Sequence, residues 1–96
     1  MMIDMAGALP FILARLRKCP LGDGLDLRTY KRDRSVLVMR SGEDAYLVNQ
    51  NGFERERFDS DGKGLKKLIK NLLKREFPRS RKIRVQPVEG ARKEMG

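Results

Sequence analysis

Residues 59–77 read DSDGKGLKKLIKNLLKREF, and this stretch decides the fold. Apolar residues recur in it at the i, i+3, i+4 spacing of one helical face, while lysines fall on the opposite side. The pattern predicts a long amphipathic helix over Gly62–Phe77, with N-cap candidates in residues 59–61 and a stop at Pro78. Its buried side is predicted to consist of Leu65, Leu68, Ile69, Leu72, Leu73 and Phe77.

Upstream of this helix, turn signals alternate with strand-like segments. Period-two alternation or a short apolar run predicts strands over Leu25–Tyr30, Val36–Met39, Ala45–Val48 and Phe53–Phe58. The Asn51-Gly52 pair favours a hairpin, because both residues tolerate positive φ. The charged middle of the last strand predicts that it lies at an edge of the sheet. These segments therefore form an antiparallel meander.

Two further segments complete the predicted fold. Pro10 suits the first turn of a short helix over Pro10–Lys18, and Lys82–Val88 alternates as another strand. The order α-β-β-β-β-α-β predicts a two-layer α+β sandwich, in which both helices cover an antiparallel sheet of four or five strands. We expect one domain over residues 1–88 and a disordered tail over residues 89–96.

The N-terminal segment is apolar but does not resemble a signal peptide. Met1–Leu13 lacks a basic n-region and carries Asp4 where a positive charge would stand, so we expect it to pack on the domain. No apolar run reaches the roughly 18 residues of a membrane span. Cys19 is the single cysteine in a chain without histidine, which favours a reducing, cytoplasmic setting.

The positive charge is concentrated towards the C-terminus. The formal net charge is +9, and residues 61–96 contribute twelve basic and four acidic residues, a net +8. Such asymmetry favours a polyanionic partner, either nucleic acid or an anionic membrane surface. The alternative is a solvated basic face on a protein of generally high charge.

Three local patterns fall short of a chemical site. Asp59–Gly64 resembles the opening of a calcium loop, but Lys63 and Lys70 stand where oxygen ligands are needed. Gly62-Lys-Gly64 lacks the rest of a Walker loop, and Cys19 has no histidine base. We therefore predict no enzyme, no metal, no cofactor and no small-molecule ligand.

The basic tract is the remaining candidate for function. From Lys63 to Arg84 the chain has ten basic residues and one acid, Glu76. Such a surface suits phosphate contacts that do not depend on base sequence. Only Tyr30, Tyr46 and Phe53 are expected on an exposed sheet face, so backbone or shape recognition is favoured over reading of single-stranded bases. The predicted nucleic-acid-binding residues are Lys63, Lys66, Lys67, Lys70, Lys74, Arg79, Arg81, Lys82 and Arg84.

The order of elements and the Gly62-Lys-Gly64…Lys66-Lys67…Lys70 helix resemble double-stranded-RNA-binding domains. That family has an α-β-β-β-α order, and the resemblance implies that lysines at the start of the second helix meet RNA phosphates. The chain departs from the family in lacking its histidine-bearing loop and in having Leu72-Leu73 in place of an alanine-rich helix. The signal-recognition-particle Alu-binding domains are similar in outline. In overall character the chain resembles small uncharacterised archaeal proteins, those of methanogens especially, which implies a cytosolic protein.

Two hypotheses follow from the sequence. The first is a small non-enzymatic binding module that contacts nucleic-acid phosphates, RNA before DNA. The second is a protein-interaction or subunit module that uses the apolar N-terminal arm, Met1–Leu9, or a sheet edge to dock on a partner or a second copy.

Overall fold

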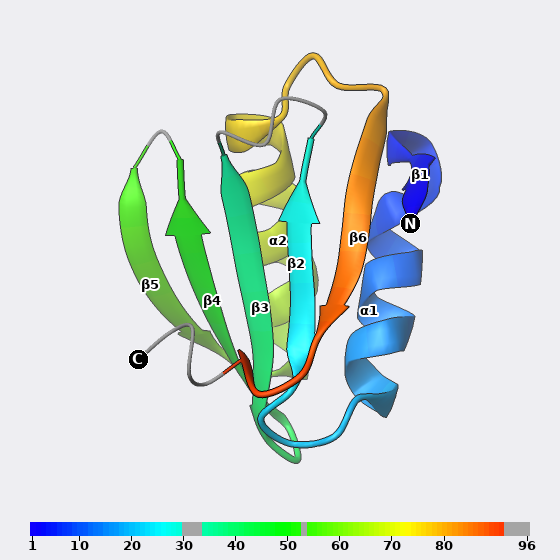
Figure 1. Ribbon diagram of the computed structural model, residues 1–96. Helices are drawn as coiled ribbons and strands as arrows, with labels where there is room; N and C mark the ends of the chain where they lie inside the picture. Colours follow the sequence, from blue (N-terminus) through cyan, green and yellow to red (C-terminus); the bar gives the residue numbers. More distant parts are fainter. Residues whose placement is uncertain (30–33, 53, 92–96) are drawn as a thin grey trace.

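The computed structural model describes residues 1–29, 34–52 and 54–91 (Figure 1). Its α-helices are α1 (Ala8–Lys18) and α2 (Gly62–Glu76), and a short 3-10 turn, η1 (Met5–Gly7), leads into α1. The strands are β1 (Met2–Asp4), β2 (Gly24–Arg28), β3 (Ser35–Gly42), β4 (Ala45–Asn51), β5 (Arg55–Ser60) and β6 (Lys82–Val88).

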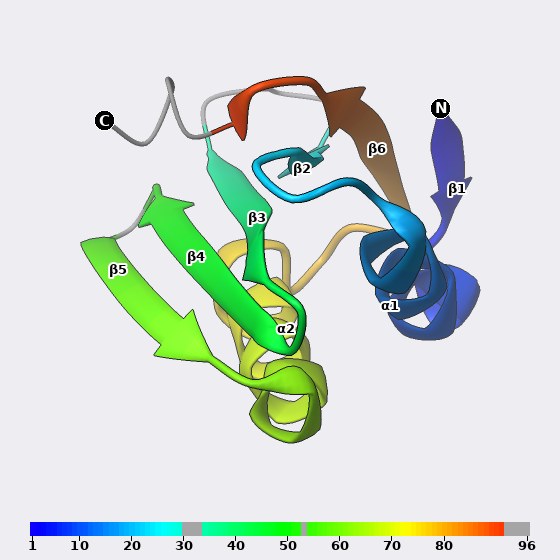
Figure 2. The ribbon, with the colours of Figure 1, turned by 90° about the horizontal axis from the view of Figure 1, so that it is seen from below.

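The described strands form one antiparallel sheet in the order β1-β6-β2-β3-β4-β5. Figure 2 shows α1 and α2 on the same face of this sheet. The predicted α+β class with two helices and an antiparallel sheet is confirmed. The sheet has six strands rather than the predicted four or five, and the order begins with a strand.

The unpredicted strand is β1, which the sequence places in an N-terminal arm. Met2 lies opposite Arg84 and Ile3 opposite Ile83, so β1 forms one edge of the sheet beside β6. Only three residues long, β1 is too short for period-two alternation to reveal it. The other edge is β5, as its charged sequence predicts.

Strand β3 is covered on both faces. Val36 and Val38 face the helices, whereas Leu37 and Met39 lie on the opposite face in a small cluster with Ala91. Ala91 is fully buried, so the packed chain extends three residues past the predicted boundary at Val88. Residues 92–96, the rest of the predicted tail, lie outside the described residues.

Gly24 permits the close approach of β2 to β3. A Cβ atom at this position would collide with the carbonyl oxygen of Val38, so any side chain would force the two strands apart. Glycine usually weakens a strand, because it has no side chain to pack and loses more entropy on folding. At Gly24 the close backbone contact requires it.

The boundaries of α2 follow local chemistry closely. The side chain of Asp61 accepts a hydrogen bond from the Gly64 N–H at 2.8 Å, which identifies it as the N-cap among the predicted candidates. Glu76 ends the helix one residue before the predicted end, and Pro78 follows. Helix α1 begins at Ala8, two residues before the predicted start, because η1 leads directly into it.

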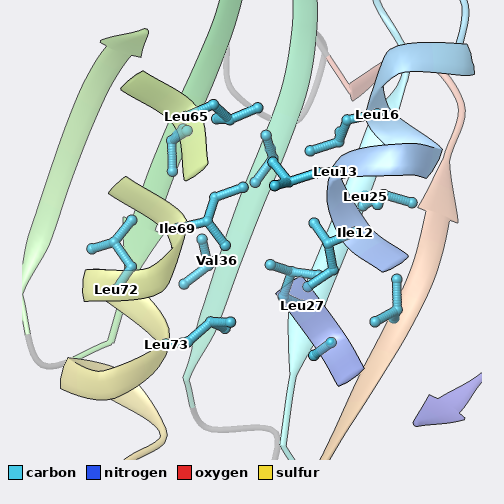
Figure 3. Packing of buried hydrophobic residues seen from close by; sticks show 14 of the residues in the cluster. Ile12, Leu13, Leu16, Leu25, Leu27, Val36, Leu65, Ile69, Leu72 and Leu73 are labelled. Carbon is cyan, nitrogen blue, oxygen red and sulfur yellow. The ribbon is translucent and has the colours of Figure 1, made fainter. Parts of the chain in front are cut away.

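The main core lies between the sheet and the two helices. Figure 3 shows apolar side chains of α1 and α2 meeting those of β2 and β3. Of the six apolar positions predicted for α2, five are buried and Leu68 is half-buried. At about 25 cal/mol per Å² of apolar surface removed from water, these side chains supply the principal stabilisation of the fold.

Deleting residues 1–8 should destabilise the protein. This segment supplies β1 and η1, Ile3 and Met5 pack on the core, and Ala8 is fully buried. A loss of 1 kcal/mol lowers the melting temperature of a domain this size by about 4–8 °C, so we expect a drop of at least about 5 °C by circular dichroism.

Two single substitutions in the N-terminal segment test whether the packing of its side chains stabilises the protein. Ile3→Ala should lower the melting temperature, whereas Met2→Ala should have little effect because Met2 is 39% exposed. Equal melting temperatures for the intact and deleted proteins would contradict a packing role for the arm.

Candidate nucleic-acid interface

Five exposed lysines follow the outer face of α2. Leu65, Ile69 and Leu72 are buried against the sheet, which turns the opposite side of the helix to solvent. From Lys63 to Lys74 the axial distance is about 16 Å at 1.5 Å per residue. We call this set the basic row; its members are Lys63, Lys66, Lys67, Lys70 and Lys74.

Helix α1 adds Arg17 to one end of the basic row. The two helices run antiparallel, so the C-terminus of α1 lies beside the N-terminus of α2 (Figure 1). Arg17, Lys63 and Lys66 line an open hollow of about 530 Å³ there, together with residues of the β3–β4 turn. Within this hollow Asp44 accepts a hydrogen bond from the Gly62 N–H at 3.0 Å, so a carboxylate already occupies this end of α2.

Among the described residues no acid forms an ion pair with the basic row, although Glu43 and Asp44 line the hollow at its Lys63 end. Across α1 and α2 the single acidic residue is Glu76, which is 2% exposed. Within the described ranges, ion pairs join Asp26 to Arg28 and Glu54 to Arg75 and involve no member of the basic row. The outer side of α2 is therefore a line of solvated positive charge.

The structure divides the nine predicted binding residues between two faces. Arg79 and Arg81 are exposed in the connection that follows α2, near the far end of the basic row. Lys82 and Arg84 alternate with the core residues Ile83 and Val85, so they lie on the sheet face away from both helices. One flat partner cannot contact the basic row and these two residues together.

The open sheet face carries polar residues, and Tyr46 is not among them. Arg84 lies opposite Arg28 on this face, and Arg55 lies further along the same row of paired residues, beyond Ser35 and Asn51. The Arg28 Nε donates a hydrogen bond to Asp26 Oδ2 at 2.7 Å. Tyr46, expected on this exposed face, is 3% exposed in the core beneath the helices, so that expectation is wrong. Tyr30 and Phe53 lie outside the described residues.

Cys19 is held as a neutral thiol. Its Sγ lies 3.3 Å from the Leu16 carbonyl oxygen and 3.7 Å from that of Asp23, and the side chain is half-buried. Burial raises the pKa of the thiol, and the nearby Arg40 guanidinium lowers it only in part. These surroundings disfavour a thiolate nucleophile.

The described residues were also compared with the requirements of a metal site and of a membrane-spanning helix. In the part of the chain that the structure describes, no three side chains of the metal-binding types gather in one place. None of the described helices is both long and apolar enough to span a membrane.

Sequence reasoning missed a buried polar pair beneath α2. Gln50 Nε2 donates to Glu76 Oε2 at 3.0 Å, with the two residues 0% and 2% exposed. A signal for Gln50 was present, because it continues the inward-facing alternation of Tyr46 and Val48. Its partner is 26 residues away, and only the tertiary structure brings Glu76 to it.

Comparisons with protein-family models, with curated proteins and with solved structures find no match. The function is therefore inferred from the surface itself.

Proposed function

We propose that this protein is a non-enzymatic module that binds the phosphate backbone of nucleic acid, RNA before DNA, through the basic row. The observation that carries the proposal is the line of five exposed lysines, none of which forms an ion pair with another described residue. Arg17 at one end and Arg79 and Arg81 at the other extend the same cationic surface. Lys82 and Arg84 lie on the opposite sheet face and are left out of the proposed contact.

The shape of the basic row suits a double-stranded partner. Phosphates in a duplex are spaced about 3.4 Å per strand along the axis, so a row about 16 Å long spans about five steps. Unpaired bases are usually recognised by stacking on exposed aromatic rings. Tyr46 is buried and Phe77 is 3% exposed, so these two rings offer no such platform. The preference for RNA follows the resemblance to double-stranded-RNA-binding domains.

The alternative, a protein-interaction module that docks through the N-terminal arm or a sheet edge, receives less support. The N-terminal arm pairs with β6 in its own chain. Strand β5 presents Arg55, Glu56, Arg57 and Asp59 along the other edge, and charged side chains disfavour pairing with a further strand. Strand β1 is an edge of only three residues that includes Asp4, and β5 is charged, so neither edge offers a long apolar strand.

Removing four charges from the basic row should abolish tight binding to duplex RNA. The substitutions are Lys63→Gln, Lys67→Gln, Lys70→Gln and Lys74→Gln, which leave the apolar face of α2 intact. Each neutralised phosphate contributes about 0.9 to the slope of log K against log salt, so about five phosphate contacts should give the unaltered protein a slope of about −4 to −5. Fluorescence anisotropy with labelled duplexes of unrelated sequence should show the same loss for each.

The sheet face provides a control with the same change in charge. A quadruple variant in which glutamine replaces Arg28, Arg55, Lys82 and Arg84 should bind duplex RNA nearly as well as the unaltered protein, because these residues lie away from the basic row. Equal losses of RNA affinity in the two quadruple variants would mean that binding depends on the net charge of the protein and not on the basic row. Undetectable binding at low salt, or binding indifferent to the four lysines, would contradict the proposal and leave the basic row as a solvated surface.

A further inference from the structure

An apolar groove lies between the first turns of α1 and the last turns of α2. Its volume is about 340 Å³, and its floor contains the buried Leu73 of α2 and the buried Phe77, the residue that follows the end of the helix. Met5 and Leu9 form the facing wall, and both are half-buried. We call this feature the helix groove.

The N-terminal segment builds one wall of the helix groove. The Met5 N–H donates to the Arg81 carbonyl oxygen at 2.7 Å, which fixes η1 against the connection between α2 and β6. That connection supplies Pro78 and Ser80 to the end of the groove. The groove therefore exists only because β1 and η1 pack in their own chain.

The rim of the helix groove is positively charged. Lys70 and Lys74 line it directly, and the exposed Arg79 and Arg81 alternate with its lining residues Pro78 and Ser80. None of the described residues that line it is acidic. An apolar floor inside a cationic rim fits a ligand that combines a bulky apolar group with negative charge.

We propose that the helix groove binds an acidic amphipathic helix of a partner protein, with one bulky apolar side chain seated between Leu9 and Phe77. Charge complementarity selects the acids, which would lie beside Lys70 and Lys74. The apolar lining selects a leucine or phenylalanine, since helices commonly insert such anchors into grooves of this kind.

A nucleobase fits the helix groove less well. Among the described lining residues Ser80 alone has a side-chain hydroxyl, and the lysine ammonium groups can donate but not accept hydrogen bonds. A base inserted there would leave polar edge atoms without partners, at a cost of roughly 1–3 kcal/mol for each buried group. A leucine or phenylalanine side chain has no such atoms.

The test uses the full-length protein and two synthetic peptides of about 15 residues labelled with fluorescein. The first has glutamates on one helical face and leucine or phenylalanine at i, i+4 and i+7 on the other. The second has the same charges, with serine at each apolar position. We expect the apolar peptide to bind at least tenfold more tightly by fluorescence anisotropy, because only it can fill the groove.

Two lysine substitutions distinguish the groove from general attraction to positive charge. Leu9→Lys places a charge in the groove wall, whereas Ala14→Lys adds the same charge at an exposed position of α1 that lines a different depression. Despite its extra charge, Leu9→Lys should weaken the apolar peptide about tenfold, and Ala14→Lys should not weaken it. Ser80→Leu, which narrows the groove without disturbing α1, should also weaken it and covers the case in which Leu9→Lys fails to fold.

Two results would overturn the inference. Equal affinity for the two peptides would mean that only charge is recognised. A Leu9→Lys protein that folds, loses duplex RNA binding and keeps the peptide would assign the helix groove to the nucleic-acid surface instead. The first result does not depend on whether the basic row binds RNA in the unaltered protein, so the two proposals can fail separately.

Discussion

Replacing Leu72 with alanine is expected to destabilise the protein by about 2–5 kcal/mol. Leu72 lies on the buried side of α2, is 2% exposed, and points into the core that α2 shares with the sheet (Figure 3). Truncation removes apolar surface and leaves a cavity that surrounding side chains fill only in part, so both contributions lower stability. Denaturant unfolding followed by circular dichroism measures the change.

Asn71 provides the control within the same helical turn. It is exposed, so Asn71→Ala should change the free energy of unfolding by no more than about 0.5 kcal/mol. A Leu72→Ala loss of that same small size would mean that the apolar face of α2 does not hold the core together.

Removing the Glu76 carboxylate should be the second large change. Glu76→Ala leaves the Gln50 amide, itself fully buried, without the acceptor that now lies 3.0 Å from Nε2. A buried hydrogen bond to a charged group contributes about 1.5–3 kcal/mol, and the orphaned amide adds its own desolvation cost. We expect thermal unfolding of Glu76→Ala at a temperature at least about 6 °C lower, given about 4–8 °C per kcal/mol.

The double variant separates the polar pair from simple loss of volume. Replacing Gln50 and Glu76 together with leucine removes both polar groups and keeps the space filled, and such exchanges are often close to neutral. The double leucine variant should therefore be more stable than Glu76→Ala. A double variant that is no more stable than Glu76→Ala would contradict this account, because both lack the carboxylate and only Glu76→Ala keeps the unpaired Gln50 amide.

Local sequence chemistry was sufficient for most of the elements. The apolar spacing in residues 62–77 predicted α2 to within one residue, and Asp61 capped it as a short polar side chain before a helix does. The exposed basic row followed from the same periodicity, because burying one side of a helix turns the other side to solvent. Period-two alternation similarly placed β2 and β6, and the charges of β5 predicted an edge.

Contacts between distant segments decided the rest. The three residues of β1 become a strand only because β6 lies beside them, and Ala91 is buried only because Leu37 and Met39 lie on the open sheet face. Arg84 belongs to the same basic tract as Lys74 in the chain, yet strand alternation in β6 directs it to the face opposite α2. Sequence spacing specifies which residues share a face of one element. It does not specify how faces of different elements are oriented towards one another, because that depends on the packing of the whole core.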